Sequence, residues 1–295
     1  MYDILILGAG PAGITAGIYG ARGGLDVAII DKMSFGGQLA LTSEIENFPG
    51  FSSINGFELS YKMQQQAESL GVKFLYEEIV EVDLENKQVK TTQNTYNAKA
   101  IIIALGASPR LLGNAREAEL TGSGVSYCAT CDGAFFRNKA VAVIGGGNTA
   151  VEDAIYLANF CSKVYLVHRR EGFRATKYEM DKLHSKQNIE LVLNSVVSEI
   201  LGENVVEGVV VTNKQEEKRV LQVSGIFVAI GRNPNTELFV DKLQLENGYI
   251  VVDSEMRTNL PNIYACGDII AKNLRQVVTA CSDGAIAAEC AIKEI

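Results

Sequence analysis

Two cysteines stand two residues apart in the stretch SYCATCDGAFF, which covers residues 126–136. Cys128 and Cys131 form a CxxC motif, and Asp132 follows directly after the second cysteine. Such a pair can bind a metal, form a structural disulfide, or act as a redox centre that alternates between disulfide and dithiol. The stretch alone leaves all three functions open, so the elements around it must distinguish them.

The composition narrows the compartment and the partners of the protein. The chain has 295 residues, a net charge of −8 and 47% hydrophobic residues, which suits two domains with substantial cores. An acidic chain lacks the basic face that nucleic acids or anionic lipids require. No apolar run reaches the roughly 18 residues of a membrane span, and the start MYDILILGAG carries Asp3 and no basic region. We therefore expect a cytoplasmic protein, a setting in which structural disulfides are rare.

The remaining cysteines argue against a zinc site. Structural zinc needs four ligands, commonly two CxxC pairs or one pair with two histidines. Only one CxxC is present, at Cys128 and Cys131. The other cysteines, which form no second pair, are Cys161, Cys266, Cys281 and Cys290. We expect no metal.

Two short segments share one glycine pattern. ILILGAGPAG at 4–13 is an apolar run followed by GxGxxG, and VAVIGGGNTA at 141–150 is an apolar run followed by GxGxxA. The pattern positions are Gly8, Gly10 and Gly13 in the first copy and Gly145, Gly147 and Ala150 in the second. The first position permits a tight turn, the second lets the backbone approach a pyrophosphate, and the third must be small so that helix and strand can pack. Both copies therefore predict dinucleotide binding at a helix N-terminus.

Each glycine loop begins the same series of elements. Helices are expected at 14–24 and 151–160, second strands at 26–31 and 163–168, and β-meanders at 80–92 and 205–223. A further strand at 262–269 and a closing helix at 275–293 follow the second copy. The sequence thus predicts an α/β protein with two Rossmann-like dinucleotide-binding domains, one inserted into the other. The inserted domain is expected at 111–233, and the first domain at 1–110 and 234–295.

The two copies differ in charge where the second strand ends. This position meets the adenosine ribose, where an acid accepts hydrogen bonds from the hydroxyls and a cation accommodates a 2′-phosphate. Asp31 occupies it in the first copy, which favours FAD. His168 occupies it in the second, followed by Arg169, Arg170 and Arg174. Guanidinium groups pair with phosphate, so this copy favours NADPH. The alternative is a basic strand end that is exposed to solvent and binds no phosphate, which would show the same residues.

The implied cofactors favour the redox interpretation of CxxC. Reducing a disulfide takes two electrons, which NADPH can supply as a hydride and a flavin can carry. After NADPH and the flavin, a dithiol/disulfide pair is then the expected third redox centre. The CxxC also precedes the second nucleotide-binding strand by about ten residues, unlike its place in a small thioredoxin-like domain.

Several motifs together resemble one family. They are CATCDGAFF, GGGNTA, HRREGFR, the GGQ at 36–38, the ENFPG at 46–50, AIGRNPNT, and the final CGD with RQ. In this order they are similar to those of the low-molecular-weight, bacterial-type thioredoxin reductases, over nearly the whole chain. The resemblance implies two dinucleotide domains with three-layer ββα folds. It also implies a flavoprotein, usually a homodimer, that reduces thioredoxin with NADPH.

The resemblance also implies roles for particular residues. Cys131 is the thiol nearest the flavin C4a, Cys128 attacks the substrate disulfide, and Asp132 manages protons during exchange. As a residue type alone, Asp132 is equally suited to the turn before Gly133. The implied FAD residues are Gly8, Gly10, Pro11, Ala12, Gly13, Asp31, Lys32, Gly36, Gly37, Gln38, Asn47, Asp268, Arg275, Gln276 and Val277. The implied NADPH residues are Gly145, Gly147, Asn148, Thr149, Ala150, His168, Arg169, Arg170, Arg174, Ile230 and Gly231.

In the family, one domain rotates against the other so that the disulfide and the nicotinamide reach the flavin in turn. Pro109 and Pro234 lie near the two domain crossings expected here, where a double linker can act as a hinge. The chain departs from the family pattern at Cys266 and Cys281, where small residues are usual. Both are more typical of core cysteines than of redox centres.

Three other functions use related sequences. An alkyl hydroperoxide reductase flavoprotein would add an N-terminal thioredoxin-like extension, whereas this sequence starts at the FAD strand. A dithiol oxidase or ferredoxin-driven reductase would lose the second glycine pattern or its arginines. A non-catalytic flavin-binding protein would not need Cys128, Cys131 and Asp132 together.

Overall fold

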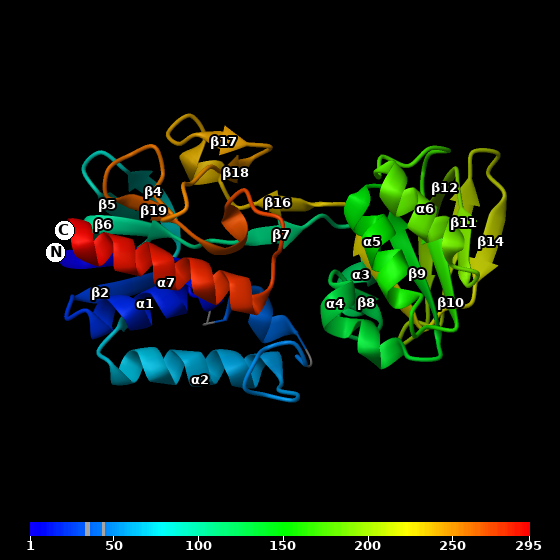
Figure 1. Ribbon diagram of the computed structural model, residues 1–295, viewed down its shortest axis with the longest axis horizontal. Helices are drawn as coiled ribbons and strands as arrows, with labels where there is room; N and C mark the ends of the chain where they lie inside the picture. Colours follow the sequence, from blue (N-terminus) through cyan, green and yellow to red (C-terminus); the bar gives the residue numbers. More distant parts are fainter. Residues whose placement is uncertain (33–35, 43–44) are drawn as a thin grey trace. The chain divides into compact units, whose positions relative to one another are not determined.

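The computed structural model describes residues 1–32, 36–42 and 45–295. Two compact units make up the chain (Figure 1). We call Met1–Ser108 with Asn233–Ile295 the split unit, and Pro109–Arg232 the inserted unit. Each is built on a largely parallel sheet with helices, so the predicted α/β class with two Rossmann-like sheets is confirmed.

A seven-stranded sheet forms the centre of the split unit, in the order β3-β2-β1-β6-β5-β4, with β19 also paired to β6. The parallel strands are β1 Tyr2–Leu7, β2 Val27–Asp31, β3 Lys73–Tyr76, β6 Thr95–Ile103 and β19 Ile263–Ala265. The antiparallel meander adds β4 Ile79–Asp83 and β5 Gln88–Thr91. Two short strands, β17 Leu245–Glu246 and β18 Tyr249–Ile250, pair with each other.

Strand β1 shows why this sheet is buried on both faces. Successive side chains of a strand point to opposite faces. Ile4 and Ile6 therefore enter one core and Leu5 and Leu7 the other, and all four are completely buried. A continuous apolar run is what a parallel strand covered on both sides requires.

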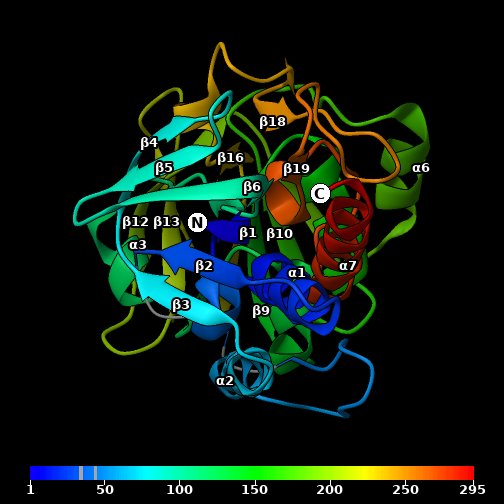
Figure 2. The same ribbon diagram turned by 90° about the vertical axis from the view of Figure 1, so that its left-hand side faces the viewer.

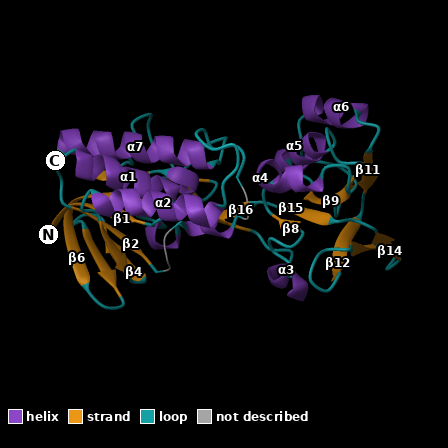
Figure 3. Cartoon of the chain, turned by 90° about the horizontal axis from the view of Figure 1, so that it is seen from below, coloured by secondary structure: helices purple, strands orange, loops and turns teal. Residues whose placement is uncertain are grey.

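Helices cover one face of this sheet (Figures 2 and 3). They are α1 Pro11–Arg22, α2 Gly56–Ser69 and α7 Val277–Glu294, and the short 3-10 helices of the unit are η1 Gly37–Leu41, η3 Glu237–Phe239 and η4 Gly267–Ile269. Helices α1 and α7 pack very closely. A Cβ added at Gly284 would lie 2.1 Å from the carbonyl oxygen of Ala12, so only glycine permits this approach.

The inserted unit contains a five-stranded parallel sheet in the order β11-β10-β9-β15-β8. These strands are β8 Val125–Ser126, β9 Ala140–Gly145, β10 Lys163–Val167, β11 Ile189–Val192 and β15 Gly225–Ala229. An antiparallel sheet consists of β12 Ser195–Leu201, β13 Gly208–Asn213 and β14 Lys218–Leu221. The helices are α3 Ala115–Glu119, α4 Ala129–Asp132, η2 Gly133–Phe136, α5 Asn148–Leu157 and α6 Lys177–Ser185.

The chain passes from one unit to the other twice, through two short strands that are far apart in the sequence but lie side by side. Strands β7 Ala107–Pro109 and β16 Arg232–Pro234 pair with each other. The chain passes between the units at 108/109 and 232/233, where the sequence had indicated 110/111 and 233/234.

Some element boundaries differ from the sequence-based expectation. Helices α1 and α5 begin at Pro11 and Asn148, before the expected starts at 14 and 151, because the last turn of each glycine loop is already helical. The strand expected at 262–269 is confined to Ile263–Ala265 and gives way to η4. Among the residues that the structure describes, no helix is both long and apolar enough to cross a membrane.

Candidate functional sites

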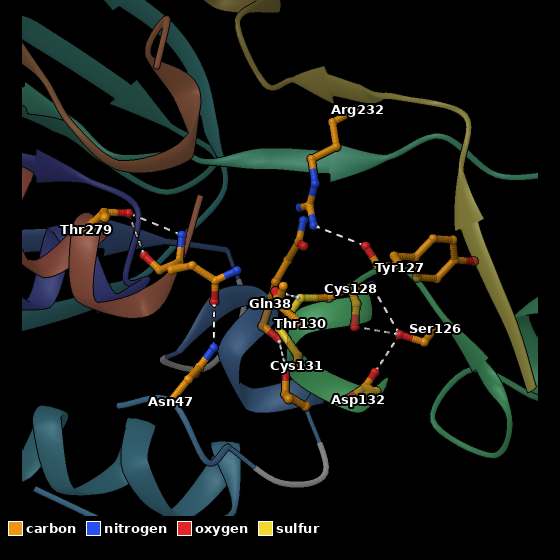
Figure 4. Close-up of a disulfide and its surroundings, with 12 residues drawn as sticks. Gln38, Asn47, Ser126, Tyr127, Cys128, Thr130, Cys131, Asp132, Arg232 and Thr279 are labelled. Carbon is orange, nitrogen blue, oxygen red and sulfur yellow. Dashed lines mark hydrogen bonds between the residues drawn. A yellow bond between two sulfur atoms is a disulfide. The ribbon is translucent and has the colours of Figure 1, made fainter. Parts of the chain in front are cut away.

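The CxxC motif forms a closed disulfide (Figure 4). Cys128 and Cys131 are bonded to each other, with Cα atoms 5.3 Å apart. Cys128 is the N-cap of α4, and its carbonyl oxygen accepts hydrogen bonds from the amides of Cys131, at 3.3 Å, and Asp132, at 3.1 Å. One turn of helix thus brings the two sulfurs together. Because each sulfur is bonded to the other, neither is a metal ligand in this state.

Asp132 is held beside the disulfide by one hydroxyl. Ser126 Oγ donates to Asp132 Oδ2 at 2.6 Å and accepts from the Cys128 amide at 3.1 Å. Asp132 Oδ1 is buried and has no hydrogen-bond partner among the described residues. Burial raises the pKa of Asp132, and the bond from Ser126 opposes that rise in part. A carboxyl group whose neutral form is favoured can supply a proton near a leaving thiolate.

The first glycine loop has the shape that a pyrophosphate cradle needs. Gly8 has φ +109°, and a Cβ there would lie 2.4 Å from the Ala104 carbonyl oxygen. A Cβ at Gly13 would lie 1.9 Å from the Gly8 carbonyl oxygen, so both positions demand glycine. Nothing lies within 4 Å of a Cβ added at Gly10, which leaves open space in front of the loop. The residues present therefore fit a bound diphosphate.

The second loop has similar space around its glycines in the inserted unit, although Gly145 does not share the left-handed backbone of Gly8. A Cβ at Gly145 would lie 2.4 Å from the Ala229 carbonyl oxygen, whereas one at Gly147 would meet nothing within 4 Å. Gly147 caps α5 and Gly10 caps α1, and neither helix has a side-chain cap or an acidic residue in its first turn. The first amides of both helices are thus left for an anionic group.

Different residues stand at the ends of the two second strands. Asp31 Oδ2 accepts a hydrogen bond from the Ala9 amide at 2.8 Å, which fastens the first glycine loop. His168 is buried, and its ring fills the space beside Gly146, where a Cβ would lie 2.0 Å from the ring. The ring stacks on Phe173 at 5.1 Å, and burial lowers the pKa of His168. The positive charge at this site therefore comes from the residues that follow.

Three arginines form an exposed basic loop after β10. Arg169, Arg170 and Arg174 are exposed, and none makes an ion pair within the described part of the chain. The Arg174 amide donates to the Gly146 carbonyl at 2.8 Å, which ties this basic loop to the glycine loop. Unpaired guanidinium groups beside a diphosphate cradle suit a second phosphate group.

The structure brings together several other residues of the expected flavin set. Asn47 Nδ2 donates to Gln276 Oε1 at 3.0 Å, although the two are far apart in sequence (Figure 4). Gln276 forms a capping box with Thr279 at the start of α7. Arg275 lies over the Tyr249 ring, 4.3 Å from its centroid. The segment that carries the GGQ and ENFPG motifs is described only in part, since 33–35 and 43–44 lie outside the described residues.

The remaining residues of the implied FAD and NADPH sets lie at the ends of helices and strands or in the loops between them. Val277 begins α7, Gln38 donates to the Ala107 carbonyl oxygen, Gly36 and Gly37 have φ of +96° and +54°, and Lys32 is exposed after β2. In the inserted unit, Thr149 is exposed on α5, Ile230 is exposed after β15, and Gly231 has φ +112°. Asn148 accepts a hydrogen bond from the Thr176 amide at 3.1 Å, which adds a second tie to the basic loop.

Three polar residues that bear on these sites were missed in the sequence. Lys272 forms ion pairs with Asp283 at 2.7 Å and with Asp268, one of the implied FAD residues, at 3.6 Å. Asp283 also accepts from the Gly267 amide at 3.2 Å. Ser126, beside Asp132, is the third. Lys272 stands four residues after Asp268, a spacing that pairs side chains on a helix, but no helix spans these residues, so only the folded chain reveals these contacts.

The two cysteines that depart from the family pattern are free thiols. Cys266 is completely buried, and burial strongly raises its pKa. Burial is also the main cause that raises the pKa of Cys281. Raised pKa values disfavour the reactive thiolate, as expected of cysteines that serve in packing.

Comparisons with known proteins agree on one family. Residues 2–284 match the family described as pyridine nucleotide-disulphide oxidoreductase. The thioredoxin reductase of Listeria innocua is 45% identical over 301 residues, covering 100% of this chain and 94% of that protein. The crystal structure of the thioredoxin reductase from Streptococcus pyogenes matches with a TM-score of 0.93 at 42% identity, covering 100% of this chain and 98% of that one. The FR conformation of Lactococcus lactis thioredoxin reductase, also 42% identical, matches with a TM-score of 0.70 over 99% of this chain and 98% of that one.

The agreement extends over the whole length of the chain and includes the closed Cys128–Cys131 disulfide. It confirms the resemblance that the motifs indicated. The chain belongs to the pyridine nucleotide-disulphide oxidoreductase family and, within it, to the low-molecular-weight thioredoxin reductases.

Proposed function

We propose that this chain reduces the disulfide of thioredoxin through Cys128 and Cys131, with NADPH as the hydride donor and FAD as the two-electron carrier. The observation that carries the proposal is the closed disulfide in a unit that also has a glycine loop and an exposed basic loop. The other unit supplies a second glycine loop with an acid in place of the basic loop.

We assign the two cofactors by charge. FAD would be held in the split unit by the loop Gly8–Gly13, by Asp31 and by the contacts around Gln276 and Asp268. NADPH would be held in the inserted unit by the loop Gly145–Ala150, with Arg169, Arg170 and Arg174 at the 2′-phosphate. His168, which is buried, would support the basic loop rather than contact the phosphate. The remaining positions of both sets stay proposals on the same grounds.

The thiol chemistry needs only residues of this chain and the substrate. In the reduced dithiol, the Cys128 thiolate attacks one sulfur of thioredoxin, whose disulfide breaks as a mixed disulfide forms. The released thioredoxin thiolate takes a proton, which Asp132 is placed to provide. Cys131 then attacks Cys128 Sγ, the second thioredoxin thiolate leaves, and the Cys128–Cys131 disulfide is restored. Two electrons have passed from the dithiol to thioredoxin.

We also propose rotation between the two units during turnover. The two crossings, β7 and β16, are three residues long and pair with each other. A single two-stranded ladder is a simple hinge, since few dihedral angles need to change. A homodimer and a cytoplasmic setting, where thioredoxin keeps thiols reduced, complete the proposal. Light scattering of the purified protein tests the dimer.

Cysteine variants test the function directly. We expect Cys128→Ser and Cys131→Ser each to abolish NADPH-dependent reduction of thioredoxin. Cys131→Ser should also trap a one-cysteine thioredoxin carrying a nitrothiobenzoate leaving group as a mixed disulfide on a non-reducing gel, because no second thiol remains to release it. Cys161→Ala is the matched control, since Cys161 is a buried free thiol of the same unit. Turnover retained in either Ser variant would refute the assigned dithiol.

Nucleotide preference tests the basic loop. Each contact from Arg169 or Arg170 to a 2′-phosphate is worth about tenfold or more in binding. Replacing both by Ala should raise the KM for NADPH at least about tenfold while that for NADH changes little. Lys214→Ala, on an exposed turn of the same unit, is the control for a general loss of positive charge. Equal use of NADH and NADPH by the unmodified protein would contradict the assignment.

A further inference from the structure

Ser126 is the buried residue that links the acid to the first redox cysteine. It is the last residue of β8 and is 5% exposed. Its Oγ lies 2.6 Å from Asp132 Oδ2, 3.1 Å from the Cys128 amide nitrogen and 3.3 Å from the Cys128 carbonyl oxygen (Figure 4). One hydroxyl thus touches the side chain of the acid and both backbone polar groups of the cysteine.

A serine hydroxyl has one proton to donate, so it cannot serve both acceptors at once. When Asp132 is ionised, the proton goes to Oδ2, because a bond to a charged carboxylate is shorter and stronger than one to a carbonyl. When Asp132 is protonated on Oδ2, that carboxyl can donate to Ser126 Oγ instead. The Ser126 proton is then free to turn toward the Cys128 carbonyl, 3.3 Å away.

We propose that Ser126 is a positioning residue for thiol–disulfide exchange, whose hydroxyl holds Asp132 in place and turns between Asp132 and the Cys128 carbonyl as Asp132 gains or loses its proton. This inference rests on the proposed function only for the identity of the disulfide substrate. The exchange itself involves the cysteines and Asp132, which lie within four residues of one another in one unit.

Few other charged groups face Asp132. Helix α4 packs against η2, which has no titratable residue, and against α5. Helix α5 carries Glu152 and Asp153, and burial raises the pKa of Asp153 to about 7. Neither is among the groups that shift the pKa of Asp132, which burial raises and Ser126 lowers. Ser126 is therefore the polar group through which the ionised form of Asp132 is stabilised.

Removal of the hydroxyl has a directional consequence. In Ser126→Ala, the Asp132 carboxylate loses its only hydrogen bond among the described side chains, so its ionised form is less stable. We expect its pKa to rise by about one to two units, as the loss of a hydrogen bond to a charged group implies. Asp132 then stays protonated to higher pH.

Single-turnover exchange measures this pKa without NADPH. The holoenzyme is reduced with dithiothreitol, desalted, and mixed with bis(2-hydroxyethyl) disulfide over a range of pH in a stopped-flow instrument. In this step the dithiol becomes the Cys128–Cys131 disulfide, and the hydroxyethyl disulfide becomes two thiols. Its alkanethiolate is a poor leaving group and needs a proton, whereas the nitrothiobenzoate of Ellman's reagent does not. The part of the pH profile in which the exchange rate changes as Asp132 titrates is called the limb. Asp132→Asn should remove this limb, and the limb should also be absent with Ellman's reagent.

We expect Ser126→Ala to move that limb to higher pH, and Ser126→Thr, which keeps a hydroxyl, to restore it. In the Asp132→Asn background, Ser126→Ala should have no effect on the profile. Ser195→Ala is the matched control, because Ser195 is a buried serine of the same unit whose Oγ donates to the Leu193 carbonyl. A second measurement, the carbon-13 titration of the Asp132 carboxyl in the oxidised protein, reports the same shift.

An unchanged limb in Ser126→Ala would overturn the proposal, as would an equal shift in Ser195→Ala. If Ser126→Ala does not fold, Ser126→Gly, which also lacks the hydroxyl, takes its place, and an unchanged limb in that variant would overturn the proposal. Failure of the proposed function would appear differently. The unmodified protein would then leave thioredoxin oxidised but would still show the Ser126-dependent limb with the small disulfide.

Discussion

The two glycine loops share one design, yet they differ in how closely helix and strand approach. At the third pattern position the split unit has Gly13, where a Cβ would lie 1.9 Å from the Gly8 carbonyl oxygen. The inserted unit has Ala150 at the same position, and its methyl group is accommodated and completely buried. A Cβ at either first glycine would lie 2.4 Å from a carbonyl oxygen, and one at either second glycine would meet nothing within 4 Å, although only Gly8 has a left-handed backbone, with φ +109°. The space at the first and second positions is thus alike in the two loops, whereas the size limit at the third depends on how each helix packs.

The units also differ at the end of the second strand. Asp31 holds its glycine loop by a hydrogen bond to the Ala9 amide, and His168 supports its loop by packing a neutral ring on Gly146. Both residues therefore stabilise the loop itself, whatever they contribute to a ligand. A residue at the end of the second strand therefore has two separate roles, to stabilise the glycine loop and to contact a ligand. The sequence position alone does not distinguish them.

The largest expected effect comes from exchanging the third loop residue. Gly13→Ala places a methyl group against a backbone oxygen, which cannot move away as a side chain can. We expect a loss of about 3 kcal/mol or more in unfolding free energy. Ala150→Gly should cost only about 0.5–1 kcal/mol, the ordinary cost of glycine in a helix. Urea unfolding followed by circular dichroism measures both, and equal losses would show that the two loops pack alike.

A smaller but more selective effect is expected at the second loop residue. Gly10 and Gly147 have extended backbone, with φ/ψ of −77°/179° and −97°/−178°, and space for a methyl group. Alanine should therefore leave unfolding free energy within about 0.5 kcal/mol of the original. We expect Gly10→Ala to weaken FAD binding about tenfold or more and Gly147→Ala to weaken NADPH binding similarly, because the methyl group occupies the pyrophosphate position.

Flavin fluorescence of the apoprotein titrated with FAD, and the KM for NADPH, report the two sites separately. Each variant is the control for the other. If Gly10→Ala impaired NADPH binding as much as FAD binding, the assignment of one nucleotide to each unit would be wrong.

The smallest expected effect is a pH dependence confined to the inserted unit. Because the pKa of His168 is lower in the folded protein than its usual 6.5, the unfolded chain binds a proton first as pH falls. Stability contributed by neutral His168 is thus complete above about pH 6.5 and declines below it. His168→Gln should remove this decline.

Hydrogen exchange of the β9 and β10 amides between about pH 5 and 8 follows the inserted unit specifically. His184→Gln is the matched control, because His184 is exposed on α6. The same decline in His168→Gln would mean that other groups of the unit cause it.

Much of the fold follows from local patterns. The apolar runs that end in Gly8 and Gly145 predicted the central strands, because a continuous run bounded by a glycine turn is what a strand buried on both faces requires. The starts of α1 and α5 were placed too late, because periodicity becomes visible only after the first turn of a helix.

The sequence by itself determined which residues could do chemistry. The spacing of Cys128 and Cys131 permits a disulfide across one helical turn, and the reversal of charge between Asp31 and the basic loop distinguishes the two glycine loops. These properties depend on residue type and short separation, which any conformation of the chain preserves.

Only the tertiary structure decided which polar groups meet. Asn47 reaches Gln276 because the loop that contains Asn47 lies beside the start of α7, and Lys272 joins Asp283 to Asp268 across the turn before that helix. Ser126 binds Asp132 because the chain between the end of β8 and the end of α4 folds so that the two residues lie side by side. Such contacts depend on how elements pack, and no pattern in the chain records the partner of a single hydroxyl or carboxylate, since its neighbours are set by burial and backbone direction.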